Sequence, residues 1–144
     1  MWVQKGKLAA MTRPCFLVID REFPGSISTR KLVIETAKFN VITAYSGLEA
    51  FDTVQRFPAL SGAVVDGGIE DIPCADLVRR IKAILPALPV IVIAAPGFTG
   101  CPQADFTLET FEPAKLLELL KSLKPVESAE IEKRNEELSR EKLS

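Results

Sequence analysis

The sequence contains no histidine, and its three cysteines (Cys15, Cys74 and Cys101) share no CxxC spacing. The lack of histidine excludes Ser-His and Cys-His catalysis, and it makes a Cys/His zinc site unexpected. An odd number of cysteines argues against a secreted disulfide scaffold. We therefore expect small buried or loop cysteines in a protein of the reducing cytoplasm.

Long apolar runs and a strong net charge are also missing. No apolar run approaches the roughly 20 residues that a membrane helix needs, and the net charge is −1. We expect no membrane segment and no general attraction for nucleic acid or anionic lipid. Residues 1–13 are expected to be extended or disordered, and Met1 or Met11 fits as the start.

What the sequence does contain is an alternation of apolar runs and helical patterns, with 47% of its 144 residues apolar. Strands are predicted at 16–19, 41–44, 62–66, 88–94 and 104–108, with helices between most of them and a last helix at 113–123. Such an alternation predicts an α/β fold with a doubly wound, five-stranded parallel sheet in the order 2-1-3-4-5. We expect one domain over residues 14–124.

The helix boundaries and faces can also be predicted. Ser26 or Ser28 suits the start of the first helix, and Ser46 with Glu49 forms a capping box before the second. A third helix is expected at 75–85. Leu32, Leu48 and Ile84 are assigned to apolar, inward faces, and Arg30, Lys31, Glu35 and Lys38 to an outer face.

Between the fourth and fifth strands the chain has only a segment rich in proline and glycine, residues 95–103. Such a segment cannot hold a regular helix of any length. The fifth strand should therefore be more open along one side, and an open strand edge is a potential partner site. Phe98 is interpreted either as an anchor for a partner or as a loop residue packed on the core.

Residues 125–144 form a charged tail or linker that begins after the last packed helix. Glu130 and Arg134, and Glu136 and Arg140, are favourable pairs at helical spacing. The tail is interpreted either as a solvated helix or as the start of a coiled-coil linker that dimerises or leads to a partner domain.

Two carboxylates follow buried strands: Asp20 ends the first and Asp66 the third, where Gly67 and Gly68 let the backbone turn. Ligands of open parallel sheets bind beyond the carboxyl ends of the strands. The two residues therefore predict an acidic site.

This layout resembles the receiver domain of bacterial two-component response regulators. The matching pieces are FLVID at 16–20, TAYSGLEA at 43–50, AVVD at 63–66, PVIVIAA at 89–95 and Phe111. The resemblance implies transfer of a phosphoryl group from a histidine kinase to Asp66, with Mg²⁺ neutralising the charge. It also implies that Asp20, Asp66 and the Gly68 carbonyl would hold the metal.

Thr110 stands where the family's pattern has a proline, and three positions of the predicted site also depart from that pattern. Arg21 stands where the second acidic residue is expected, Ala94 replaces the hydroxyl residue that senses the phosphoryl group, and Glu109 replaces the lysine that pairs with it. We expect Arg21 to pair with Asp66 or Asp20 and to occupy the place of the metal, so no cofactor is expected. Glu22 is an alternative metal ligand. Arg21→Asp with Glu109→Lys is expected to restore Mg²⁺ binding.

The favoured interpretation is a non-enzymatic, receiver-like interaction module that works without phosphorylation and contacts a histidine kinase or a downstream effector. A homodimer through the open face or the tail is one arrangement. The alternative is a true phosphoacceptor at Asp66 with atypical metal use. A flavodoxin-like redox or nucleotide enzyme would need a phosphate-binding loop after the first strand, whereas residues 21–26 offer an acidic side chain and a proline.

Overall fold

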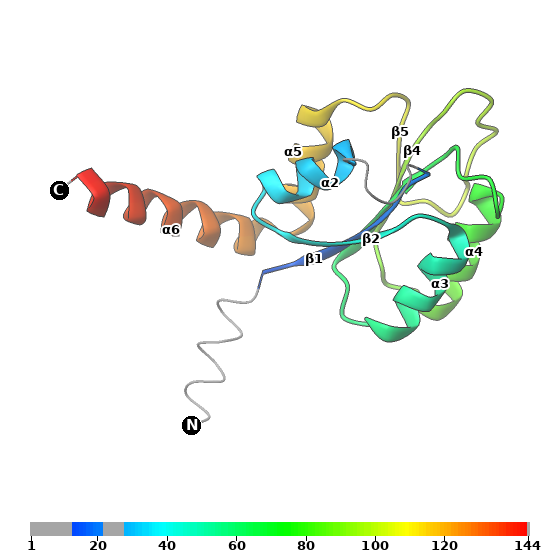
Figure 1. Cartoon of the computed structure of the whole chain (residues 1–144), viewed down its shortest axis with the longest axis horizontal. Helices are drawn as coiled ribbons and strands as arrows, with labels where there is room; N and C mark the ends of the chain where they lie inside the picture. The colour runs from blue at the N-terminus through cyan, green and yellow to red at the C-terminus, as the bar shows by residue number, and fades with distance from the viewer. Residues whose placement is uncertain (1–12, 22–27, 144) are drawn as a thin grey trace.

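Five parallel strands form the centre of the molecule in a computed structural model, which describes residues 13–21 and 28–143 (Figure 1). The strands lie in the order β2-β1-β3-β4-β5, as predicted. Their bounds are β1 Cys15–Ile19, β2 Asn40–Ala44, β3 Gly62–Asp66, β4 Val90–Ile93 and β5 Phe106–Leu108.

Burial agrees with this order. All residues of β3 and β4 are buried, which suits strands covered on both faces of a parallel sheet. In β5, Phe106 and Thr107 are exposed, and among the described residues the strand pairs with β4 alone. The sheet therefore ends in a short, open strand.

Helices cover both faces of the sheet: α2 (Thr29–Thr36) and α5 (Pro113–Leu123) lie on one side, and α3 (Gly47–Arg56) and α4 (Cys74–Ile84) on the other (Figure 1). Each side has its own apolar cluster, one around Ile34 and Leu116 and the other around Leu77 and Ile81. Residues 94–105, all of which the structure describes, contain no helix between β4 and β5. The predicted absence of this helix is confirmed.

Ser28 caps α2 by accepting a hydrogen bond from the Lys31 amide at 3.3 Å. Ser26, the other candidate, lies outside the described residues. In α3, Ser46 accepts from the Glu49 amide at 3.1 Å, and the Glu49 carboxylate accepts from the Tyr45 amide. The capping box is thus present, with its second hydrogen bond placed one residue earlier than in the usual motif.

Some of the predicted faces are wrong. Leu32, Leu48 and Ile84 are exposed by 48%, 68% and 39%, although their spacing placed them inward. Each of these short helices contacts the sheet along a narrow strip of its surface. Residues at the border of the apolar stripe therefore stay exposed.

The charged tail forms α6 (Pro125–Leu143), a helix that projects away from the sheet after a break at Lys124 (Figure 1). Its first turns pack back onto the molecule, because Ser128 is buried and Ile131 contacts the cluster around Leu116. None of the helices in the described ranges combines the length and apolar character that crossing a membrane requires.

Candidate functional site

The two predicted carboxylates meet at the carboxyl end of the sheet. Asp66 is the last residue of β3, and Asp20 directly follows β1, the neighbouring strand. Their side chains are exposed by only 2% and 0%. Buried carboxylates need partners, because an unpaired buried charge is costly.

Arg21 supplies one partner. Its Nε lies 3.3 Å from Asp66 Oδ2, while half of its side chain remains in solvent. A Cβ placed on Gly68 would lie 2.8 Å from Arg21 Nη1, so the guanidinium rests directly on this glycine. The ion pair predicted between Arg21 and Asp66 is present.

Arg30 supplies the second partner, and here the predicted outer face is wrong. Its guanidinium lies 3.6 Å from Asp66 Oδ2 and 3.7 Å from Asp20 Oδ1, with 16% of the side chain exposed. Arg30 lies in the first turn of α2, and that turn starts at the same edge of the sheet where β1 ends. Arg30 is the second residue of α2, two positions after the capping Ser28, and the sequence spacing alone assigned it to the outer face.

The helix cap is part of the same network. Ser28 Oγ donates a 2.7 Å hydrogen bond to Asp20 Oδ2 and also accepts from the Lys31 amide. The Gly68 amide donates to Asp66 Oδ1 at 2.8 Å. Two aspartates and two arginines thus form a locally neutral cluster that joins β1, β3 and α2.

The other two altered positions contribute no charge to this cluster. Ala94 directly follows β4, and its amide donates to the Leu108 carbonyl at 2.8 Å. Glu109 is exposed and has no ion-pair partner among the residues that the structure describes. The positive charge beside Asp66 comes from Arg21, directly after Asp20, and from Arg30 in α2.

Gly67 is needed for space rather than for an unusual backbone angle, since neither Gly67 nor Gly68 has a positive φ. A Cβ on Gly67 would lie 2.8 Å from the Ile93 carbonyl oxygen and 3.1 Å from Phe98 Cδ1. Phe98 is half-buried against the core. Its interpretation as a packed loop residue is confirmed.

The residues at this site do not fit a divalent metal. Mg²⁺ requires several oxygen ligands in near-octahedral geometry, but two guanidinium groups lie against the Asp66 carboxylate and one covers Gly68. Within the described ranges, no cluster of three or more acidic, cysteine or histidine side chains could hold a metal. Glu22 lies outside the described residues.

Two buried thiols lie near the acidic cluster. Burial raises the pKa of Cys74 to about 12, and the nearby Cys101 and the charge of Asp66 add to the shift. Burial also raises the pKa of Cys101, whose Sγ contacts the Cys74 carbonyl oxygen at 3.8 Å. Cys74, Cys101 and the half-buried Cys15 are all free thiols, as expected.

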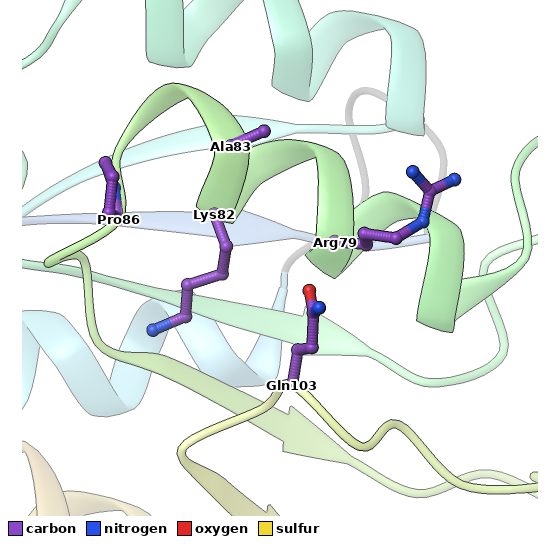
Figure 2. Close-up of a pocket in the computed structure, with 5 residues that line it drawn as sticks. All are labelled: Arg79, Lys82, Ala83, Pro86 and Gln103. Carbon is purple, nitrogen blue, oxygen red and sulfur yellow. The ribbon is translucent and has the colours of Figure 1, made fainter.

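A hollow of about 510 Å³ lies beside the segment that replaces the missing helix. Figure 2 shows Lys82 and Arg79 of α4 and Gln103 of this segment around it. Both cations are already paired, Lys82 with Asp105 at 2.6 Å and Arg79 with Asp76 at 3.2 Å. Because Asp105 also accepts from the amide at the start of β4, the hollow lies at the end of the sheet opposite Asp66.

No family model matches the sequence, and no curated protein matches it either. Solved structures do match the fold. A response regulator receiver domain of Clostridium thermocellum superposes with a TM-score of 0.67 at 21% identity, covering 76% of this chain and 93% of its own. A CheY-like receiver domain of Methanospirillum hungatei has a TM-score of 0.67 at 18% identity, with coverages of 82% and 99%.

A chemotaxis response regulator of Vibrio cholerae is also similar, with a TM-score of 0.62 at 21% identity and coverages of 78% and 99%. Together these neighbours show that the chain has the fold of a response regulator receiver domain. At such low identity the likeness establishes the fold, whereas the function has to be argued from the site.

Proposed function

We propose that this protein is a receiver-like interaction module of two-component signalling that works without phosphorylation of Asp66. The observation that carries the proposal is the pairing of the Asp66 carboxylate with both Arg21 and Arg30. A carboxylate in two ion pairs is a poor nucleophile, and guanidinium groups stay charged at every physiological pH. The position of the metal is taken by side chains of the chain itself.

The remaining machinery for phosphoryl transfer is also weak. Transition-state stabilisation comes from fixed donors and cations, and losing one such donor typically costs about 2.7–4 kcal/mol. Ala94 has no side-chain donor, and Glu109 is an anion that would oppose the developing charge. These departures support a non-catalytic role.

The proposed partners are signalling proteins, a histidine kinase or a downstream effector. The surface that favours contact is the open side of β5, where the fold lacks a helix and where Phe106 is exposed by 39%. An open strand edge can pair with another chain. A second copy of this chain is a further candidate for that edge.

Intact-mass spectrometry after incubation with acetyl phosphate and Mg²⁺ tests the proposal. An active receiver domain serves as the positive control and the Asp66→Asn variant as the negative one. We expect no added phosphoryl group on the parent protein under conditions that label the positive control. An added group that disappears in Asp66→Asn would contradict the proposal and establish the alternative, a true phosphoacceptor at Asp66.

A further inference from the structure

Arg30 makes a third contact that the acidic cluster does not require. Its guanidinium carbon lies 5.2 Å from the centre of the Phe111 ring, within the range of a cation–π interaction. Phe111 lies between β5 and α5 and packs against the cluster around Leu116. One side chain therefore touches both the acidic cluster and the connection that follows the open strand.

The two contacts use different parts of the guanidinium group. Its nitrogens approach Asp20 and Asp66, whereas its flat face is available to the ring. Arg21 does not have this double role, because it pairs with Asp66 but is half exposed and is not stacked on Phe111. Of the two arginines, Arg30 is thus the one that connects the two regions.

The start of α2 keeps Arg30 in place. Ser28, directly before the helix, donates a hydrogen bond to Asp20, and α2 itself packs against α5. Because the backbone of Arg30 is held from both sides, loss of the charge on Asp66 would change the position of the side chain rather than that of the helix.

We propose that Arg30 is a positioning residue that couples the charge on Asp66 to Phe111 and to the adjacent connection between β5 and α5. Loss of that charge weakens the hold on the guanidinium and alters the packing of Phe111. Because coupling between two sites is reciprocal, a partner that moves Phe111 also changes the acidic cluster. The consequence for partners rests on the proposed function, whereas the coupling itself does not.

Double-mutant cycles in the full-length chain test the coupling. Asp66→Asn and Phe111→Leu are made singly and together in three backgrounds: parent, Arg30→Met and Arg21→Met. Chemical unfolding gives the unfolding equilibrium constant of each variant. In the parent and in Arg21→Met, we expect the two changes to deviate from additivity by about threefold or more.

In the Arg30→Met background, the two changes should add to within about twofold. Arg21→Met is the matched control, since it removes a cation from Asp66 but leaves the ring contact intact. Additivity in the parent, or coupling that persists in Arg30→Met, would overturn the inference.

A second measurement uses a variant that keeps the positive charge at position 30, which Arg30→Met removes. Arg30→Lys keeps the charge but removes the flat face, and NMR reports the ring and amide signals of Phe111. We expect these signals to move in Arg30→Lys and in Asp66→Asn, but not in the neighbouring control Lys31→Arg. Unchanged Phe111 signals in Asp66→Asn would refute the coupling, whatever the phosphorylation experiment shows.

Discussion

At the scale of single residues, the main feature of the acidic site is that two arginine side chains pair with Asp66. Arg21 comes from the position where the family has an acidic residue, and Arg30 comes from a neighbouring helix. Removing one member of a buried ion pair typically costs about 3–5 kcal/mol, because the other charge stays uncompensated. The arginines thus stabilise a pair of carboxylates that would otherwise repel each other.

Arg30 changes what is needed to restore a metal site. Arg21→Asp with Glu109→Lys leaves the Arg30 guanidinium on both aspartates, so this double variant should bind Mg²⁺ only weakly. Adding Arg30→Met removes that charge, and we expect binding about tenfold tighter or more than in the double variant. Isothermal titration calorimetry measures the difference, with Arg30→Met alone as the control. Equal affinities of the double and triple variants would show that Arg30 does not block the metal.

The thiol of Cys74 provides a second prediction at this scale. Its pKa is raised by burial from 9.0 to about 12, so the folded protein keeps the thiol proton that the unfolded chain loses. The contribution of this group to stability is therefore complete below pH 9 and is lost as the pH rises from 9 towards 12. Between these two values, the free energy of unfolding falls by up to about 1.4 kcal/mol per pH unit.

Urea unfolding between pH 8 and 10 measures this slope. We expect Cys74→Ala to be less stable than the parent at pH 8 but to lose less stability as the pH rises. Cys15→Ala removes a thiol farther from the acidic cluster. This variant should keep most of the loss of stability that the parent shows as the pH rises. An identical pH dependence in Cys74→Ala and the parent would contradict the raised pKa.

At the scale of elements, the start of α3 is held from two directions. Ser46 accepts from the Glu49 amide, while Asp71, in the loop after β3, accepts from the amides of Gly47 and Leu48 at 2.9 and 3.2 Å. A carboxylate at a helix N-terminus also interacts favourably with the helix dipole. This contact ties the loop after Asp66 to the neighbouring helix.

Replacing Asp71 should therefore destabilise the protein more than replacing an ordinary surface carboxylate. We expect Asp71→Ala to lower the free energy of unfolding by about 1 kcal/mol. Asp52→Ala, which removes an exposed i,i+4 pair with Arg56, should cost about 0.5 kcal/mol or less. Urea unfolding of both variants compares them, and equal losses would mean that Asp71 does not act as a cap.

These elements also show what the sequence could predict. The strands follow from apolar runs such as residues 62–66, because such runs are buried on both faces. Their order follows from the alternation of strands and helices, because each crossover between parallel strands is right-handed. Ser46 and Glu49 were recognisable because a capping box lies within four consecutive residues. The Asp71 cap joins residues 23 or more positions apart, and Arg30 reaches Asp66 only through the crossover from β1 to α2, so neither contact appears as a local pattern.

At the scale of the whole molecule, the missing helix and the altered acidic cluster belong to the same part of the sheet. Phe98, from the segment that replaces the helix, packs over Gly67 directly after Asp66. Phe111, from the connection after β5, stacks on Arg30. The segment without a helix and the acidic cluster therefore meet around the end of β3.

The tail offers a prediction about the whole chain. Among the described residues, the first turns of α6 pack on the rest of the molecule: Ser128 is buried, Ile131 packs against the core, and Glu132 pairs with Lys121 at 2.9 Å. The side chains described at 132–141 are exposed. A chain that ends at Lys133 should therefore keep its stability to within about 0.5 kcal/mol.

A chain that ends at Lys124 loses the buried part of Ile131 and should be less stable by about 1–2 kcal/mol. Urea unfolding of both truncated chains and of the full chain measures these differences, and Ile131→Ala in the full chain should give part of the larger loss. If the two truncated chains were equally stable, α6 would make no energetic contact with the sheet domain. In that case the coiled-coil interpretation of the tail would be favoured, since its apolar positions would be free for another chain.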